Sequence, residues 1–224
     1  MTVLGFDTSN YTTSVAIFDG ASGENQSRLL PVKAGALGLR QADALFAHVK
    51  SLPALTGGLF SHVDPGSVAA VGVSTRPRAV EGSYMPCFLA GVCLAQTVAA
   101  LLKVPLVEVS HQQGHLAVAL WSAGRQELFA SPFLAWHLSG GTTELLYTQP
   151  HGWNLDCSRI GGTTDISAGQ LIDRTGQLLE MPFPAGKALD RLSQEAGAVE
   201  GYRVKCPETE FSLSGVENQV QQYL

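Results

Sequence analysis

Residues 5–18 read Gly-Phe-Asp-Thr-Ser-Asn-Tyr-Thr-Thr-Ser-Val-Ala-Ile-Phe, and this stretch decides the fold. Two runs rich in strand-forming residues, 3–8 and 14–19, flank a short polar turn, which predicts a β-hairpin. Residues 137–147 read His-Leu-Ser-Gly-Gly-Thr-Thr-Glu-Leu-Leu-Tyr and predict a second hairpin of the same kind. Two hairpins with similar small polar turns indicate an internal duplication.

The segments after each hairpin support the duplication. In the first half the patterns predict strands at 27–32, 69–74 and 106–109, a helix from residue 39 that ends before Pro53, and a helix at 88–102. In the second half they predict strands at 133–138, 143–147 and 154–159 and helices at 166–179 and 213–224. The helix at 88–102 is apolar almost all round and is expected to be covered on most sides.

This order of elements predicts an α/β fold of two βββαβα lobes, the architecture of actin, hexokinase and Hsp70. We expect a first lobe at residues 1–110, and a second lobe at 111–224 that begins with a histidine-bearing helix.

Composition excludes several classes of protein. Fourteen Lys and Arg against nineteen Asp and Glu give the 224 residues a net charge of −5, so a broad positive surface for nucleic acid is not expected. The N-terminal stretch lacks the basic region of a signal peptide, and no apolar run reaches the roughly 20 residues of a membrane span. The four cysteines form no C-x-x-C pair. A cytoplasmic protein without a membrane segment is expected.

The turn of the second hairpin is a candidate phosphate-binding site. Ser139, Gly140 and Gly141 allow a close backbone approach to an anion, and hydroxyl groups lie beside them. Asp7, Thr8 and Ser9 occupy the equivalent turn of the first hairpin. The alternative for both turns is an ordinary hairpin connection.

Two further groups of residues are candidates for ligand contact. His111 and His115 are spaced i, i+4, so a helix places them on one face, where they can chelate a divalent metal or simply form a polar surface. Asp173 lies between Gly169 and Gly176 on the next predicted helix. The Asp173 carboxylate can bind a ribose, or the two glycines can allow a neighbouring helix to pack closely. Both interpretations are kept.

Taken in this order, the motifs resemble the TsaD/Gcp family, formerly described as a glycoprotease. The matching stretches are Gly-Phe-Asp-Thr-Ser at 5–9, His-x-x-Gly-His at 111–115, Leu-Ser-Gly-Gly at 138–141, Ile-Asp at 172–173, Phe-Pro-Ala-Gly at 183–186 and Phe-Ser-Leu-Ser-Gly at 211–215. Because they spread over nearly the whole chain, the set is far more specific than any one member.

The resemblance implies a transferase that moves a threonylcarbamoyl group from its adenylate to a tRNA adenosine. His111 and His115 would bind one divalent metal, iron or zinc, and ATP or an acyl-adenylate would be the ligand. The residues implied in ligand contact are Asp7, Thr8, Ser9, His137, Leu138, Ser139, Gly140, Gly141, Asp173, Gly186 and Asp190. The implied partners are a TsaB-like or TsaD-like subunit or a second copy, with tRNA reached only through a complex.

The chain also departs from the family pattern. Tyr11 and Thr12 stand where the family has acidic residues, Gln113 replaces a glutamate, and Ser-Thr-Arg-Pro-Arg at 74–78 replaces a glycine-rich loop. The family also continues beyond the end of this sequence, which implies an incomplete second lobe. The alternatives are therefore a non-catalytic partner resembling TsaB, or a relative of the small-molecule kinases of this fold.

Overall fold

The chain forms two compact units, Met1–Gly124 (unit 1) and Arg125–Leu224 (unit 2). The computed structural model describes residues 1–9, 11–31, 39–197 and 201–223. The sequence placed a boundary after residue 110, but helix α3 (His111–Ser122) packs against strands β4 and β5 and so lies in unit 1. None of the helices in these ranges combines the length and hydropathy needed to span a bilayer.

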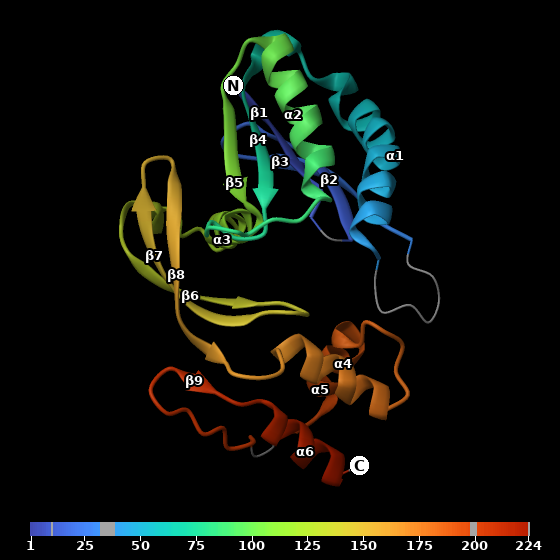
Figure 1. Cartoon of the computed structure of the whole chain (residues 1–224), viewed down its shortest axis with the longest axis vertical. Helices are drawn as coiled ribbons and strands as arrows, with labels where there is room; N and C mark the ends of the chain where they lie inside the picture. The colour runs from blue at the N-terminus through green and yellow to red at the C-terminus, as the bar shows by residue number, and fades with distance from the viewer. Residues whose placement is uncertain (10, 32–38, 198–200, 224) are drawn as a thin grey trace. The chain divides into compact units, whose positions relative to one another are not determined.

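Unit 1 is built on a five-stranded sheet (Figure 1). Its strands, in the spatial order β3-β2-β1-β4-β5, are β3 (Gly23–Leu29), β2 (Thr12–Phe18), β1 (Thr2–Asp7), β4 (Val68–Arg76) and β5 (Leu106–Ser110). The predicted hairpin is confirmed, because β1 and β2 pair antiparallel from Val3 with Phe18 to Asp7 with Ser14. Strands β1, β4 and β5 run parallel, so the carboxyl ends of all three lie along one edge of the sheet.

Helices α1 (Gln41–Leu59) and α2 (Phe88–Leu102) pack against this sheet. Alternate strand residues point toward them and are buried, among them Leu4, Phe6, Val71 and Val73. Two short 3-10 helices, η1 (Phe60–His62) and η2 (Pro65–Ser67), connect α1 to β4. The core of unit 1 therefore follows from the period-two pattern of its strands.

Two expectations for these helices were wrong. Helix α1 continues through Pro53 to Leu59, and its buried side comprises Ala44, His48, Ser51, Leu52, Leu55 and Leu59. The Thr56 hydroxyl donates to the Leu52 carbonyl inside the helix. Helix α2 is covered on one side only, since Leu101 is 79% exposed and Cys93 is also exposed. Two helices on one sheet face leave the outer side of each helix uncovered.

Unit 2 contains a four-stranded sheet in the order β6-β7-β8-β9. The strands are β6 (Phe133–Leu138), β7 (Thr143–His151), β8 (Asn154–Thr163) and β9 (Glu210–Phe211). The helices are η3 (Gln126–Ala130), α4 (Ala168–Leu178), α5 (Gly186–Glu195) and α6 (Ser214–Tyr223). Strands β6, β7 and β8 form an antiparallel series like β1, β2 and β3, which agrees with the predicted duplication.

The α/β fold class with two sheets is confirmed, and the two units differ in completeness. In unit 1 the second edge of β1 pairs with β4, whereas no strand within the described ranges pairs with the second edge of β6. Both hydrophobic core clusters of the described chain belong to unit 1. In unit 2, α4 packs mainly on α5 and α6, and its Leu178 is 46% exposed.

Candidate functional site

Three predicted residues form a row at the carboxyl edge of the unit 1 sheet. The Oδ2 atom of Asp7 lies 2.9 Å from Nδ1 of His111, and Nε2 of His111 lies 2.8 Å from Nε2 of His115. Asp7 is the last residue of β1, and both histidines belong to α3, which begins directly after β5. The parallel arrangement of β1, β4 and β5 brings these segments to one edge, where open α/β sheets bind ligands.

The start of helix α3 is fixed by a reciprocal cap. The Gln113 backbone N–H donates to Oγ of Ser110, while Oε1 of Gln113 accepts from the Ser110 backbone N–H. Such a capping box satisfies two N–H groups that a helix end leaves without partners. Gln113 therefore completes this cap and holds the turn that carries His111.

Hydrogen bonding determines the tautomers along the row. An ionised carboxylate only accepts, so Nδ1 of His111 carries the proton that faces Asp7, and in neutral His111 the Nε2 atom is an acceptor. Burial alone would raise the pKa of Asp7, but the hydrogen bond and charge of His111, with hydrogen bonds from Ser74 and Ser9, lower it to about 2. Burial and the adjacent His111 lower the pKa of His115. At neutral pH the row has an anion at one end and a neutral imidazole at the other.

The row offers two convergent nitrogen donors for a metal ion. The two Nε2 atoms meet at 2.8 Å, and a carboxylate on the far ring nitrogen is the usual orienting partner of a metal-bound histidine. Residues 1–9, 11–31, 39–197 and 201–223 contain no group of three or more His, Cys, Asp or Glu arranged to hold a metal. An ion at this place would have two imidazole ligands, His111 and His115, from the residues that the structure describes.

Thr8 and Ser9, predicted to contact ligand, face inward. Thr8 is fully buried, and its hydroxyl donates to the Cys87 carbonyl and accepts from the Gly91 backbone N–H. Helix α2 has no side-chain cap of its own, so Thr8 supplies an acceptor at its N-terminal turn. Ser9 is also buried, and its backbone N–H donates to Asp7. Thr8 and Ser9 thus lie within unit 1 beside the row, and their contact with a ligand stays a prediction.

The predicted phosphate turn of unit 2 lies against the first turn of helix α4. The Ser167 hydroxyl donates to the Gly140 carbonyl, and the Ala168 backbone N–H donates to Oγ1 of Thr143. A Cβ atom at Gly169 would lie 2.5 Å from the Gly140 Cα, so only glycine permits this approach. The turn and the positive end of the helix dipole therefore lie together, an arrangement suited to an anion.

His137 and Leu138, which precede this turn and were also predicted to contact ligand, are neighbours in strand β6. His137 pairs with Glu144 and Leu138 pairs with Thr143 across β6 and β7. Neighbouring residues in a strand point to opposite faces, so His137 and Leu138 cannot both face one ligand. Leu138 is 59% exposed.

The residues implied in adenosine contact lie on α4 and α5. Oδ1 of Asp173 accepts from the Ala185 backbone N–H at 2.9 Å, Gly186 begins α5, and Asp190 follows on the exposed side of that helix. A Cβ atom at Gly176 would lie 2.1 Å from the Cβ of Ala185. The glycines of α4 thus allow neighbouring segments to pack closely, as one of the two alternatives for Gly169 and Gly176 stated. The Oδ1 atom of Asp173 holds the loop before α5 through its hydrogen bond with Ala185.

Asp165 is a residue that the sequence analysis missed. Its carboxylate accepts hydrogen bonds from the hydroxyls of Ser212 and Ser214 and from the backbone N–H of Leu213 and of Ile166. It thereby joins the β8–α4 connection to the Phe-Ser-Leu-Ser-Gly motif. The sequence offered one signal for Asp165, an acidic residue that follows Thr-Thr just before a helix. Its partners at residues 212–214 could not be predicted, because they lie far along the chain.

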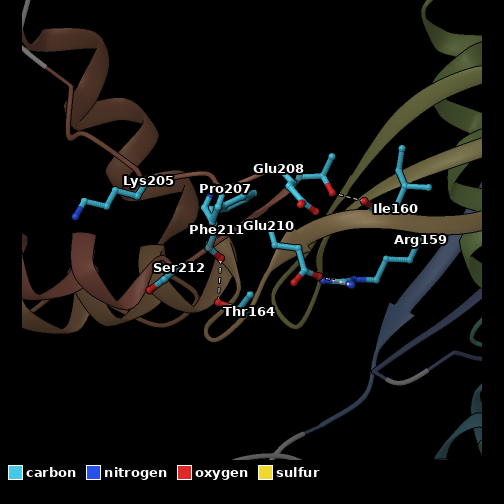
Figure 2. Close-up of a pocket in the computed structure, with 10 residues that line it drawn as sticks. Arg159, Ile160, Thr164, Lys205, Pro207, Glu208, Glu210, Phe211 and Ser212 are labelled. Carbon is cyan, nitrogen blue, oxygen red and sulfur yellow. Dashed lines mark hydrogen bonds and ion pairs between the residues drawn. The ribbon is translucent and has the colours of Figure 1, made fainter.

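A pocket in unit 2 contains none of the predicted site residues (Figure 2). It measures about 730 Å³ and lies between β8 and the segment before α6. Two contacts join groups of its lining: Arg159 pairs with Glu210 at 2.8 Å, and the Thr164 hydroxyl donates to the Phe211 carbonyl. Figure 2 shows both contacts across the pocket. We therefore do not assign a ligand to it.

The predicted residues thus form two groups. Asp7, His111 and His115 meet in unit 1. The Ser139–Gly141 turn contacts α4, and Asp173 contacts the residue before Gly186, in unit 2.

Comparison with known proteins identifies the family. The profile described as TsaD, tRNA N6-adenosine threonylcarbamoyltransferase, matches residues 42–224. Proteins of that name from Carboxydothermus hydrogenoformans and Lacticaseibacillus casei are 30% and 33% identical over 78% and 77% of this chain. Only 50% and 49% of those relatives is covered, so the chain spans about half of their length.

Among solved structures, YeaZ from Pseudomonas aeruginosa matches 70% of this chain and 64% of its own, with 18% identity and a TM-score of 0.44. The ethanolamine utilization protein EutJ from Carboxydothermus hydrogenoformans matches 85% of this chain and 61% of its own, with 15% identity and a TM-score of 0.41. The match of the family profile over most of the chain is the stronger finding: the chain belongs to the TsaD family of tRNA N6-adenosine threonylcarbamoyltransferases.

Proposed function

We propose that this chain takes part in transferring a threonylcarbamoyl group from its adenylate to a tRNA adenosine. Membership of the TsaD family supports this reaction class. The net charge of −5 supports an arrangement in which other subunits hold the tRNA. A TsaB-like or TsaD-like subunit, or a second copy, is the proposed partner.

The metal part of the proposal assigns one divalent ion, iron or zinc, to His111 and His115. Asp7 would orient His111 through Nδ1 and keep its Nε2 available to the ion. Binding would replace the hydrogen bond between the two Nε2 atoms, so His115 must present a deprotonated Nε2. The ion would act as a Lewis acid toward the carbamoyl carbonyl or the adenylate phosphate.

The nucleotide part of the proposal concerns unit 2. The Ser139–Gly141 turn and the first turn of α4 would bind the phosphate of ATP or of the acyl-adenylate, and Asp173, Gly186 and Asp190 would contact its adenosine. The Oδ1 atom of Asp173 already accepts from Ala185, which leaves Oδ2 for a ribose hydroxyl. Calorimetric titration with ATP and with adenosine, repeated on Asp190→Ala, tests these contacts. Unchanged affinity for both ligands would refute the assignment of Asp190.

The convergence of the two Nε2 atoms, with Asp7 behind one of them, is the observation that carries the metal proposal. Its test is elemental analysis of anaerobically purified protein, with zinc titration followed by calorimetry. We expect about one metal ion per chain, lost in His111→Ala and His115→Ala and retained in the control His62→Ala, whose imidazole is exposed on η1. Absence of metal under these conditions, or retention in both site variants, would contradict the proposal.

A second candidate is a non-catalytic partner resembling TsaB. Tyr11 and Thr12, in place of acidic residues at the first hairpin turn, favour it. Co-expression with a full-length TsaD protein distinguishes the transferase from the non-catalytic partner. Threonylcarbamoyl transfer to tRNA that is lost with His111→Ala supports the transferase, whereas co-purification and activity that are insensitive to this substitution support the partner.

A further inference from the structure

The loop after β4 lies at the same edge of unit 1 as the candidate site. Residues 74–78 read Ser-Thr-Arg-Pro-Arg, and β4 ends at Arg76. Strand β4 lies between β1, which ends at Asp7, and β5, which leads into α3 (Figure 1). Arg76 pairs with Ser110 across β4 and β5, and Ser110 directly precedes His111. Arg76 therefore lies at the edge that carries the row of Asp7 and the two histidines.

The residues on both sides of Arg76 contact the segments that form the row. Before it, the Ser74 hydroxyl hydrogen-bonds to the Asp7 carboxylate. After it, the Pro77 carbonyl accepts from the Gln112 backbone N–H at 3.0 Å, in the first turn of α3. The backbone of Arg76 is thus held in place beside both ends of the contact between β1 and α3.

The side chain of Arg76 is exposed, and its positive charge is not compensated. Within the part of the chain that the structure describes, its guanidinium forms neither an ion pair nor a hydrogen bond. Four other arginines each pair with a carboxylate, namely Arg40, Arg125, Arg159 and Arg174. Arg76 differs from them in that its five N–H donors stay available to a ligand at this edge.

The substrate of the proposed reaction carries a group that matches this cation. A threonylcarbamoyl group is threonine joined through its nitrogen to the carbamoyl carbon, so its α-carboxylate stays free and ionised. A guanidinium binds a carboxylate through two parallel N–H···O bonds, a geometry that a lysine cannot reproduce. The ionised Asp7 repels a second anion at this edge, and the charge of Arg76 offsets that repulsion.

We propose that Arg76 binds the α-carboxylate of the threonylcarbamoyl group and so positions the carbamoyl carbon at the row in unit 1. This inference rests on the proposed function, because that function supplies the substrate. The other arginine of the loop, Arg78, lies beyond the end of β4, where its backbone N–H donates to Oγ of Ser83 at 2.9 Å. Arg76 is the arginine that pairs with the residue before His111.

Calorimetric titration of the full chain with N-carbamoylthreonine and with its neutral amide tests the proposal. The two probes have the same shape, but only the first carries a carboxylate. We expect the native chain to bind the acid more tightly than the amide.

Arg76→Gln should weaken binding of the acid at least about tenfold and leave binding of the amide unchanged. Arg76→Lys keeps the charge without the planar fork and should weaken it less. Lys103→Gln is the matched control, because Lys103 is an exposed cation of the same unit that precedes β5 and so lies at the other end of that strand. It should change neither affinity, and circular dichroism checks that each variant is folded.

Three results would overturn the proposal. One is a native chain that binds the acid no more tightly than the amide. Another is a loss of affinity for the acid in Arg78→Gln but not in Arg76→Gln. The third is an Arg76→Gln variant that binds AMP more weakly but N-carbamoylthreonine as before, which would assign Arg76 to the phosphate. Zinc titration of the same proteins should show unchanged binding at His111 and His115, so failure here is distinguishable from failure of the proposed function.

Discussion

Asp7 shows how one side chain sets the chemistry of the candidate site. It lies at the end of a central strand, accepts from Ser9 and reaches His111 from the side opposite His115. The structure shows the carboxylate of Asp7 bonded to the His111 imidazole, and its predicted contact with a ligand stays a prediction. A carboxylate at the end of a strand indicated a functional residue. Its partner His111 could not be predicted, because the contact depends on how β1 and α3 pack together.

The first prediction concerns that orienting role. Asp7→Asn should weaken zinc binding by about 10–100-fold, because an amide holds the His111 tautomer less strongly than a carboxylate does. Calorimetric titration with zinc measures the change. Asp156→Asn is the control, since Asp156 also contacts a histidine, His151 at 2.7 Å, but this pair lies in unit 2 and includes neither His111 nor His115. Equal affinity in Asp7→Asn and the native chain would show that Asp7 does not position a metal ligand.

The second prediction concerns Thr8, which caps a helix from a distant strand. Thr8→Val removes an acceptor for the Gly91 N–H and a donor to the Cys87 carbonyl, both buried. The free energy of unfolding should fall by about 1–3 kcal/mol, measured by urea denaturation. Thr97→Val, which loses only an exposed bond to the Cys93 carbonyl, should change it by less than about 0.5 kcal/mol. Similar losses in both variants would refute the buried cap.

At the scale of elements, strands were predicted better than the faces of helices. The sequence placed β6 correctly at residues 133–138, because this mostly apolar run ends at Ser139 and Gly140. Helical spacing of apolar residues does not identify the buried side of α1, because Phe46 and Val49 are apolar and yet 65% and 53% exposed. Which side of an amphipathic helix is covered depends on the sheet beneath it, and that information is not local.

The third prediction tests the close packing of α4 on the loop before α5. Gly176→Ala would place a Cβ atom 2.1 Å from that of Ala185, so the helix or the loop must move. We expect a loss of about 1–3 kcal/mol in the stability of unit 2. Gly57→Ala in α1 has nothing within 4 Å of the new atom and should stabilise unit 1 by about 0.5–1 kcal/mol. Urea denaturation measures both, and a neutral Gly176→Ala would contradict the predicted contact.

The fourth prediction is a pH dependence from Asp165. Desolvation alone would raise the pKa of this carboxyl group, but hydrogen bonds from Ser212, Ser214, Leu213 and Ile166 outweigh it and lower the pKa. A lowered folded-state pKa stabilises the fold above the unfolded value of about 3.9, and the contribution is lost as the pH falls through the folded value. Because Asp165 is exposed, we expect less than about 1 kcal/mol.

Thermal unfolding of the native chain and of Asp165→Asn between about pH 3 and about pH 7 measures this contribution. The difference between the two should be largest near neutral pH and should shrink toward the acid end. Asp156→Asn, on an exposed pair in the same unit, serves as the control. A difference that grows as the pH falls would have the wrong sign and would contradict the assignment.

At the scale of the whole molecule, the two units follow one plan to different extents. The repeated hairpins were visible in the sequence because glycine, serine and threonine turns recur between apolar runs. The unequal cores were not visible, because Leu134, Trp136 and Leu138 have the composition of core residues and yet lie exposed. Exposure is a property of what covers a strand, and in this chain the described helices of unit 2 cover each other.

The fifth prediction follows from these unequal cores. Both core clusters lie in unit 1, so unit 2 should unfold first as urea is added. A Trp121→Phe variant leaves fluorescence only from Trp136 and Trp153, both in unit 2, and circular dichroism at high urea then reports unit 1. Coincident transitions would contradict the unequal cores.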